Sequence, residues 1–104
     1  MLYTQFDQVF FERTRLSLIT ILYRDGRASF LGLKRALGLT DGALYSHLEK
    51  LVTAGYVGKE KELVGDGVQT VYFLTEKGRR EFQRYLSFVE EVLSQRSTLD
   101  GGDR

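Results

Sequence analysis

The sequence predicts one mainly α-helical domain of the α+β class with a small β-hairpin, in the order α-(short β)-α-α-β-β-α. The chain has 104 residues, 42% of them hydrophobic and 12% aromatic, which is enough for one core. Apolar residues recur at helical spacing in four segments, and a segment with a period of two separates the last two. We assign residues 1–96 to the domain and expect residues 97–104 to form a disordered tail.

The composition of the chain argues against several classes of function. The chain has no cysteine and one histidine, which excludes thiol chemistry and gives no support to a metal site or any other cofactor. We find no nucleophile–base pair and no phosphate-binding loop, so we expect no enzyme activity. Without a membrane-length apolar run or a signal-peptide pattern, we expect a cytoplasmic protein with no membrane partner. A net charge of +1 is low for a nucleic-acid binder, so charge placement must support that role.

The first helix is expected over residues 2–24. Glycine accepts the left-handed conformation at a helix end, so Asp25-Gly26 stops it. The polar stretch 12–15 marks either a bend or an exposed turn, and residues 28–30 can form a short edge strand. Two apolar clusters lie on a similar face of this helix: Tyr3, Phe6 and Phe10, then Leu18, Ile19 and Leu22.

Two shorter helices follow, with a glycine-containing turn between them. Phe30, Leu33 and Leu37 form the apolar stripe of the second helix, which ends at Gly38. Thr40 is a suitable N-cap for the third helix, expected over residues 41–54, because its hydroxyl can accept an unpaired backbone N–H. The buried stripe of that third helix is Leu44, Leu48 and Leu51. Two helices joined in this way form a helix-turn-helix unit.

From Tyr56 onward the period changes to two. Two alternating runs around Gly65-Asp66-Gly67 predict a β-hairpin over residues 56–74. Thr75 can cap a final helix, with Glu76 in its first turn, where the helix dipole favours an anion. The apolar stripe of that helix is Phe82, Leu86, Val89 and Leu93, widened by Tyr85, Phe88 and Val92.

Over roughly residues 13–85, the chain resembles the winged helix-turn-helix transcriptional regulators of the MarR/ArsR type, in particular their small stand-alone domains. Any one local match is weak, but their order and spacing together are strong. The family's second helix and turn are matched in this chain by Leu33-Lys34-Arg35-Ala36-Leu37-Gly38-Leu39-Thr40. Its recognition helix is matched by residues 42–51. The approach to the wing and the start of the last helix are matched by Ala54-Gly55-Tyr56-Val57 and Leu74-Thr75-Glu76-Lys77-Gly78-Arg79.

The resemblance implies a DNA-binding regulator, with the third helix in the major groove and the hairpin as the wing. The chain departs from the family's pattern at some positions that would face DNA. Ala43-Leu44-Tyr45-Ser46 stands where such domains often carry Asn-Leu-Ser-Ser, and Glu49 where a basic residue is common. Asp66 and Gln69 stand near positions where the wing often has arginine. Phosphate repels an acidic wing tip, so helix docking is better supported than wing insertion.

The face of the third helix opposite its leucines is the predicted reading surface. Tyr45 and Ser46 are the expected base-edge or backbone contacts, and Lys50 is the expected phosphate contact. His47 is either a DNA-facing hydrogen-bond donor or an exposed bystander. The alternative for the third helix as a whole is an ordinary amphipathic surface helix that does not bind DNA. The DNA-binding set is Lys34, Arg35, Thr40, Asp41, Gly42, Ala43, Tyr45, Ser46, His47, Lys50, Lys59, Lys61, Gln69 and Arg79.

Two lysines on the first strand of the hairpin are further candidates for phosphate contacts. Lys59 and Lys61 share one face of the strand with no acid between them, which favours a real contact. Val57 and Leu63 share the same face, however, and are expected to be buried. For about half of the cations outside the third helix, interleaved glutamates favour a solvated mixed-charge surface instead.

The terminal helices carry more aromatic and apolar side chains than one small core needs. These residues either pack the first helix on the last helix within one chain, or pair across a two-fold homodimer. We favour the homodimer, because it covers an apolar patch and places two third helices about one DNA turn (~34 Å) apart. The expected interface is Tyr3, Phe6, Phe10, Phe82, Tyr85, Phe88, Val89 and Val92.

Two functions from different classes therefore compete. The first is a homodimeric, sequence-specific regulator that binds double-stranded DNA, and any small-molecule effector of it is left unassigned. The alternative is a protein-interaction module on the same fold without specific DNA binding, which the near-neutral charge and the acidic hairpin turn favour.

Overall fold

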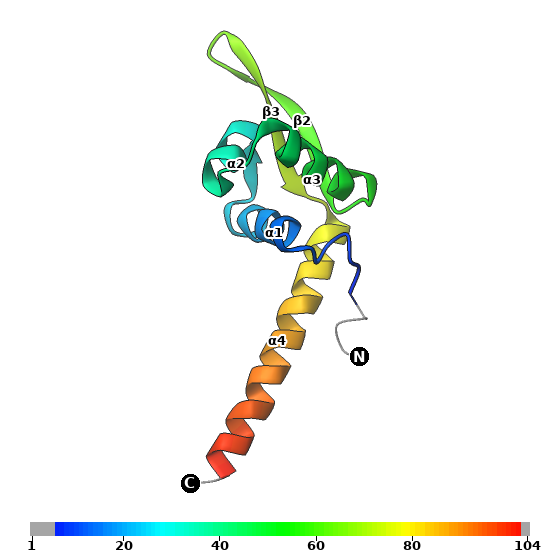
Figure 1. Ribbon diagram of the computed structural model, residues 1–104, viewed down its shortest axis with the longest axis vertical. Coiled ribbons are helices and arrows are strands. Elements are labelled where there is room, and N and C mark those ends of the chain that lie inside the picture. Colours follow the sequence, from blue (N-terminus) through cyan, green and yellow to red (C-terminus); the bar gives the residue numbers. More distant parts are fainter. Residues whose placement is uncertain (1–5, 103–104) are drawn as a thin grey trace.

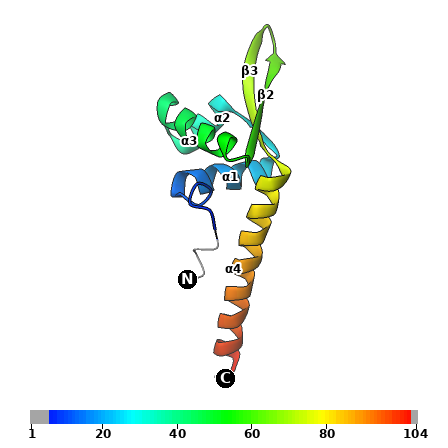
Figure 2. The ribbon, with the colours of Figure 1, turned by 90° about the vertical axis from the view of Figure 1, so that its right-hand side faces the viewer.

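The computed structural model describes the backbone of residues 6–102 and the side chains of residues 6–95. Its elements are α1 (Arg13–Asp25), β1 (Arg27–Ser29), α2 (Phe30–Leu37), α3 (Asp41–Thr53), β2 (Val57–Val64), β3 (Gly67–Leu74) and α4 (Glu76–Gly102). The predicted fold class and element order are confirmed. Figures 1 and 2 show α1, α2 and α3 gathered at the base of the hairpin, with the hairpin projecting at one end and α4 at the other.

The three strands form one antiparallel sheet in the order β1-β3-β2. The short edge strand expected at residues 28–30 is present as β1, one residue earlier in the chain. In the hairpin, Val64 pairs with Gly67, which leaves the two-residue turn Gly65-Asp66. Gly65 has a φ of 61° while Asp66 keeps a negative φ, as in the type II′ turns that suit the twist of a hairpin. Leu63 is 81% exposed, so the expectation that it is buried is wrong, because the helices reach only the base of the hairpin (Figure 2).

The core lies where α1, α2 and α3 meet the base of the sheet. The leucine stripe of α3 is fully buried, as are Leu18 and Leu22 of α1. Thr40 caps α3 by accepting a hydrogen bond from the Ala43 N–H at 3.2 Å. Gly38 ends α2 in the left-handed conformation. The buried stripe fixes which face of α3 meets the body of the protein and which meets solvent.

The prediction that the first helix begins near residue 2 is wrong for the described residues, because α1 begins at Arg13. Residues 6–12 form turns instead. Asp7 accepts a hydrogen bond from the Val9 N–H at 2.9 Å, and Glu12 caps α1 by accepting from the Arg15 N–H at 3.0 Å. Such local side-chain bonds compete with helix formation. The first four residues of the predicted span, 2–5, lie outside the described part of the chain.

In the structure α4 extends to Gly102 and so includes residues 97–102 of the expected tail, while the disorder of that tail stays a prediction. No proline or glycine occurs between Gly78 and Gly101, so nothing in the sequence interrupts the helical hydrogen bonds of the backbone. The last two residues lie outside the described range, and the domain limits stay a prediction.

A buried arginine joins three segments. Arg15 of α1 is 8% exposed, and its Nε donates to the carbonyl of Val9 in the N-terminal turn. One guanidinium nitrogen lies 3.0 Å from Nδ1 of His47 on α3, and 3.8 Å from the Glu12 carboxylate. Arginine can only donate, so Nδ1 of His47 must accept, which places the imidazole proton on Nε2. Arg15 therefore holds the N-terminal turn and α3 against α1.

The first turn of α4 approaches the start of β2 at a glycine. A Cβ atom added to Gly78 would lie 2.1 Å from the carbonyl oxygen of Tyr56, closer than any side chain tolerates. Thr75 supports this junction. Its hydroxyl donates to the Gly55 carbonyl at 2.6 Å and accepts from the Gly78 N–H at 3.1 Å. The junction fixes where α4 leaves the sheet.

We expect Gly78→Ala to lower the free energy of unfolding by about 3 kcal/mol, because the added methyl group meets a backbone carbonyl that cannot yield. Chemical denaturation followed by circular dichroism measures this. The matched control is Gly42→Ala on α3, where an added Cβ meets nothing within 4 Å. That substitution should be neutral or raise stability by up to about 1 kcal/mol. Equal effects at the two glycines would contradict the close approach.

We expect Arg15→Met to lower the free energy of unfolding by about 2 to 3 kcal/mol, because it leaves the Val9 carbonyl and Nδ1 of His47 without their donor. The control is Arg13→Met, at an exposed position of the same helix, which should change stability by less than about 0.5 kcal/mol. Thermal and urea denaturation of the two variants would test this, and similar losses in both would contradict a structural role for Arg15.

Candidate DNA-binding surface

The exposed face of α3 carries the side chains expected to read DNA. Tyr45 is 53% exposed, and Ser46 and Lys50 are also exposed, on the side opposite the buried leucines. Asp41 and Gly42 are exposed at the N-terminal end of the helix, where Ala43 is half-buried. A shallow groove of about 600 Å³ runs along this face, and it is lined by Val9, Tyr45, Ser46, Glu49, Lys50, Thr53 and Ala54.

The hairpin beside α3 separates its charges between two faces. The register pairs Lys59 with Tyr72 and Lys61 with Thr70, so both lysines lie on the face that continues from the core. Glu60 and Glu62 lie on the opposite face, where the Arg27 guanidinium of β1 forms ion pairs with both. Strand alternation thus sorts a nearly neutral sequence into a basic face and an acidic face.

An ion pair connects the basic face of the hairpin to α3. The Lys59 ammonium donates to the Glu49 carboxylate at 2.8 Å and lies 5.8 Å from the centre of the Tyr45 ring. The hydrogen bond that Lys59 donates to Glu49 raises the pKa of Lys59. A second groove of about 450 Å³ lies between the two elements, lined by Phe30, Tyr45, Lys59, Glu60, Lys61, Thr70 and Tyr72. Helix and hairpin therefore form one continuous surface.

Except for Arg35, the candidates at the turn between α2 and α3 form an ion pair or cap a helix. The Lys34 ammonium lies 2.9 Å from the Asp41 carboxylate, which ties α2 to the first turn of α3. Thr40 is occupied as the helix cap. Arg35 is exposed on α2. Of these, Arg35 presents its guanidinium to solvent, whereas Lys34 must leave Asp41 or share it to meet a phosphate.

The structure places three of the expected DNA contacts away from this surface. His47 is turned toward Arg15, and its side chain is 23% exposed. Gln69 pairs with Glu62 in the register and lies on the acidic face of the hairpin. The guanidinium of Arg79 on α4 lies 5.5 Å from the centre of the Tyr23 ring of α1, and Arg79 lines neither groove beside α3.

Several residues expected at a dimer interface pack within the chain instead. Phe10 is fully buried, Phe82 is 5% exposed and Phe6 is 9% exposed, so they offer almost no surface to a partner. Phe6 packs on Tyr85 and Phe88 of α4, with ring centres 5.9 and 5.5 Å apart. The alternative of packing between the N-terminal segment and the last helix therefore holds for these rings. Tyr3 lies outside the described residues.

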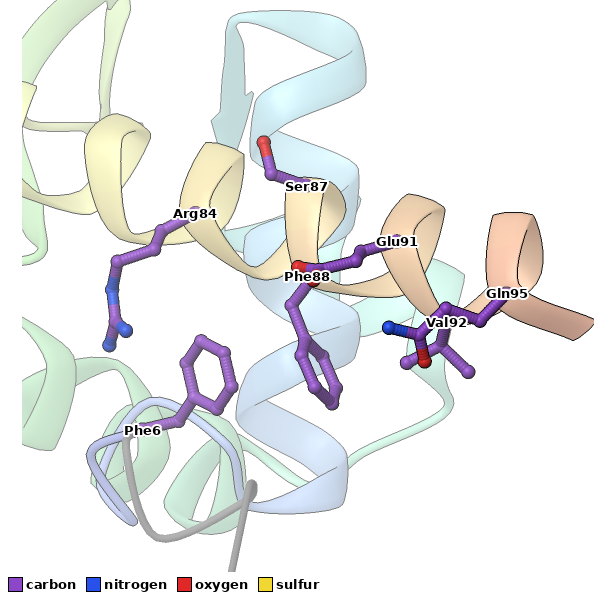
Figure 3. A pocket seen from close by; sticks show the side chains of 7 residues that line it. All are labelled: Phe6, Arg84, Ser87, Phe88, Glu91, Val92 and Gln95. Carbon is purple, nitrogen blue, oxygen red and sulfur yellow. The ribbon is translucent and has the colours of Figure 1, made fainter.

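Farther along α4 the apolar side chains are less covered. Val89 is half-buried, and Val92, Leu86 and Leu93 are 44%, 37% and 56% exposed. A cavity of about 450 Å³ opens between this stretch and the N-terminal segment. Figure 3 shows the rings of Phe6 and Phe88 side by side at this cavity, with Arg84 above Phe6. Its lining residues are Phe6, Arg84, Ser87, Phe88, Glu91, Val92 and Gln95.

Across the described residues, we find no cluster of three or more histidine, aspartate or glutamate side chains that could hold a metal ion. Nor does any helix in the same range combine the length and apolar character needed to cross a bilayer. The surface around α3 offers hydroxyl, ammonium and carboxylate groups, which suit hydrogen bonding to a polar ligand.

The sequence-based interpretation missed the residues that assemble this surface. Glu49, Arg27 and Arg15 each hold a distant segment in place through an ion pair or a hydrogen bond. Alternation along the hairpin places Glu60 and Glu62 on one face, but it does not identify Arg27 as their partner. The partners of Glu49 and Arg15 lie 10 and 32 residues away, and the sequence carries no local signal for either.

Comparisons with known proteins agree with this architecture. Residues 14–93 match the family described as the winged helix DNA-binding domain. An uncharacterised protein of Methanocaldococcus jannaschii is 35% identical over 79 residues, which cover 76% of this chain and 86% of that protein.

Solved structures agree as well. A transcriptional regulator homologue of Pyrococcus horikoshii is 29% identical with a TM-score of 0.75, over 86% of this chain and 88% of that one. A protein of Enterococcus faecalis assigned to the MarR family of transcriptional regulators shares the fold, at 24% identity and a TM-score of 0.73, over 88% and 84% of the two chains. The chain belongs to the winged helix DNA-binding domain family, as the resemblance to MarR-type regulators predicted.

Proposed function

We propose that the protein is a cytoplasmic transcription regulator that binds a specific sequence of double-stranded DNA as a homodimer. The observation that carries this proposal is the continuous surface of α3 and the basic hairpin face, joined by the Lys59–Glu49 ion pair. It presents polar side chains and cations on one side, whereas the leucine stripe holds the other side of α3 in the core. The family supports DNA as the ligand, while sequence specificity and pairing are part of our proposal.

In the proposed complex α3 lies in the major groove, which is about as wide as a helix with its side chains. The Tyr45 and Ser46 hydroxyls can each donate and accept hydrogen bonds, which suits base edges. Lys50, Lys59 and Lys61 contact phosphates on either side of the groove. The groove beside Ser46 and Lys50 leaves room for a base edge or an ordered water.

The carboxylates on this surface set how strongly it binds. Glu49 holds Lys59 and Asp41 holds Lys34, so two of the cations are partly neutralised before DNA arrives. Fewer free cations release fewer counterions, which predicts a shallower salt dependence than that of a strongly basic domain. We infer that nonspecific affinity is low and that discrimination depends on the contacts of α3.

The homodimer rests on the uncovered part of α4. Leu86, Val89, Val92 and Leu93 recur at helical spacing along a stretch that projects from the body of the protein in both views (Figures 1 and 2). Pairing this stripe with its copy in a second chain would remove it from water, and a two-fold axis makes the contact self-complementary. The pair of α3 helices would then face successive turns of a palindromic site.

The test of function is selection of genomic DNA fragments by the purified protein at two salt concentrations. We expect one class of fragments that share two inverted half-sites with centres about 10 base pairs apart. Recovery of random fragments, together with a stable complex with another protein, would favour the alternative of a protein-interaction module.

On a selected fragment, Lys50→Ala should weaken binding and reduce the slope of log K against log salt by about 1, because one phosphate contact is lost. Fluorescence anisotropy across a salt series measures both quantities. Arg80→Ala is the control, because Arg80 is exposed on α4 and pairs with Glu76 rather than with the α3 surface. An unchanged slope for Lys50→Ala would contradict a phosphate contact at this position.

We expect Val92→Asp to shift the protein from dimer to monomer, because it places a charge in the proposed apolar contact. Val92 is 44% exposed within one chain, so the substitution should not destabilise the fold of the single chain. Sedimentation velocity measures the assembly state, and loss of two-site binding should accompany the change. Gln83→Asp, at an exposed position of the same helix outside the stripe, is the control. Equal sedimentation of both variants and wild type would contradict the interface.

A further inference from the structure

His47, the single histidine of the chain, lies between a guanidinium and a carboxylate. Its Nδ1 atom is 3.0 Å from a guanidinium nitrogen of Arg15 and 3.6 Å from Oε1 of Glu12. A neutral imidazole can accept a hydrogen bond at Nδ1, whereas an imidazolium can only donate there. The guanidinium can only donate and the ionised carboxylate can only accept. The same atom of His47 therefore has a suitable partner in each protonation state.

The charged groups around His47 come from two elements. Arg15 and the cap Glu12 face the imidazole from α1, and Lys50 lies one turn farther along α3 on its exposed face. Among the described residues, α2 and the sheet give His47 no ion pair or hydrogen bond. Burial disfavours the Glu12 anion, but the N–H groups of Arg15 and Thr14 and the neighbouring cations hold the pKa of Glu12 below its ordinary value. Glu12 therefore stays charged between about pH 5 and 8, where an imidazole titrates.

Protonation of His47 moves its hydrogen bond from one partner to the other. Arg15 is 8% exposed and its Nε donates to the carbonyl of Val9, so the guanidinium is not free to turn away. A proton on Nδ1 would set two donors and two cations against each other at 3.0 Å, and that contact must break. Oε1 of Glu12 is the acceptor beside it, and it has capacity for a bond besides the one from the Arg15 N–H. The bond from α3 then passes from the buried guanidinium to the cap of α1.

The exchange affects the proposed DNA-binding surface because Arg15 also holds one wall of a groove there. Val9, whose carbonyl Arg15 binds, lines the groove beside Ser46 and Lys50 on the exposed face of α3. His47 directly follows Ser46 in the sequence. While His47 is neutral, one guanidinium therefore ties together both sides of this groove, the N-terminal turn and α3.

We propose that His47 makes sequence-specific DNA binding depend on pH: the neutral imidazole, bonded to Arg15, holds α3 as DNA requires, and acid transfers its bond to Glu12 and weakens binding. This inference rests on the proposed function. Its direction separates it from an effect of charge alone. A protonated histidine adds a cation, which by itself would strengthen binding to phosphates. The exchange of partners predicts the opposite, a specific affinity that falls on acidification.

The experiment compares wild type with His47→Gln on a fragment that wild type selects, by fluorescence anisotropy from about pH 8 to about pH 5.5 at constant ionic strength. We expect the affinity of wild type to fall by about fivefold, the effect of losing one hydrogen bond. Glutamine is the matched variant, because its amide oxygen can accept from Arg15 and does not titrate. His47→Gln should bind within about twofold of wild type at the upper pH and keep that affinity in acid. Circular dichroism at both pH values confirms that each protein is folded.

Glu12→Gln tests the partner that receives the bond. It keeps an oxygen for the Arg15 N–H but removes the negative charge beside the imidazolium, so the midpoint of the pH profile should move to lower pH. In the protein without DNA, nuclear magnetic resonance should show the Arg15 Nε–H signal changing at the same pH as the His47 ring. Equal pH profiles for wild type and His47→Gln, or tighter wild-type binding in acid, overturn this inference while the proposed function stands. If wild type selects no fragment at either pH, both are overturned.

Discussion

The proposed DNA-binding surface depends on the burial of Leu44, Leu48 and Leu51 along one side of α3. A helix has 3.6 residues per turn, so fixing this stripe also fixes the opposite side, where Tyr45 and Lys50 lie. Each buried leucine is worth about 1.5 to 3 kcal/mol, and rotating the helix would expose all three together. The body of the protein thus decides which side chains can meet a ligand, before any charge is considered.

The placement of charged side chains then decides which parts of that surface are basic and which are acidic. The chain is almost neutral, but strand alternation places the hairpin lysines on one face and the glutamates on the other. The ion pairs Lys59–Glu49 and Lys34–Asp41 join neighbouring elements while they reduce the charge available to phosphate. These exposed pairs add little stability.

Local signals predicted much of the fold, and contacts between distant residues account for most of what was missed. Thr40, Gly38 and the leucine stripe act through their near neighbours, so the helix-turn-helix unit was readable. Alternation showed that Leu63 shares a face with Lys59, but not that the helices stop short of it. The sequence identified the apolar residues near both termini. Their spacing did not distinguish Phe10, which is buried within the chain, from Val92, which is exposed. The Arg15–His47 contact links residues whose separation leaves no pattern to read.

The length of α4 gives the molecule a mechanical property. Its 27 residues make a rod about 40 Å long, attached to the sheet through the rigid junction at Gly78. A tilt of about 10° at one end of such a rod displaces the other end by about 7 Å. That displacement is about a fifth of the ~34 Å repeat of DNA. A small tilt of α4 at its far end would therefore produce a large displacement of α3.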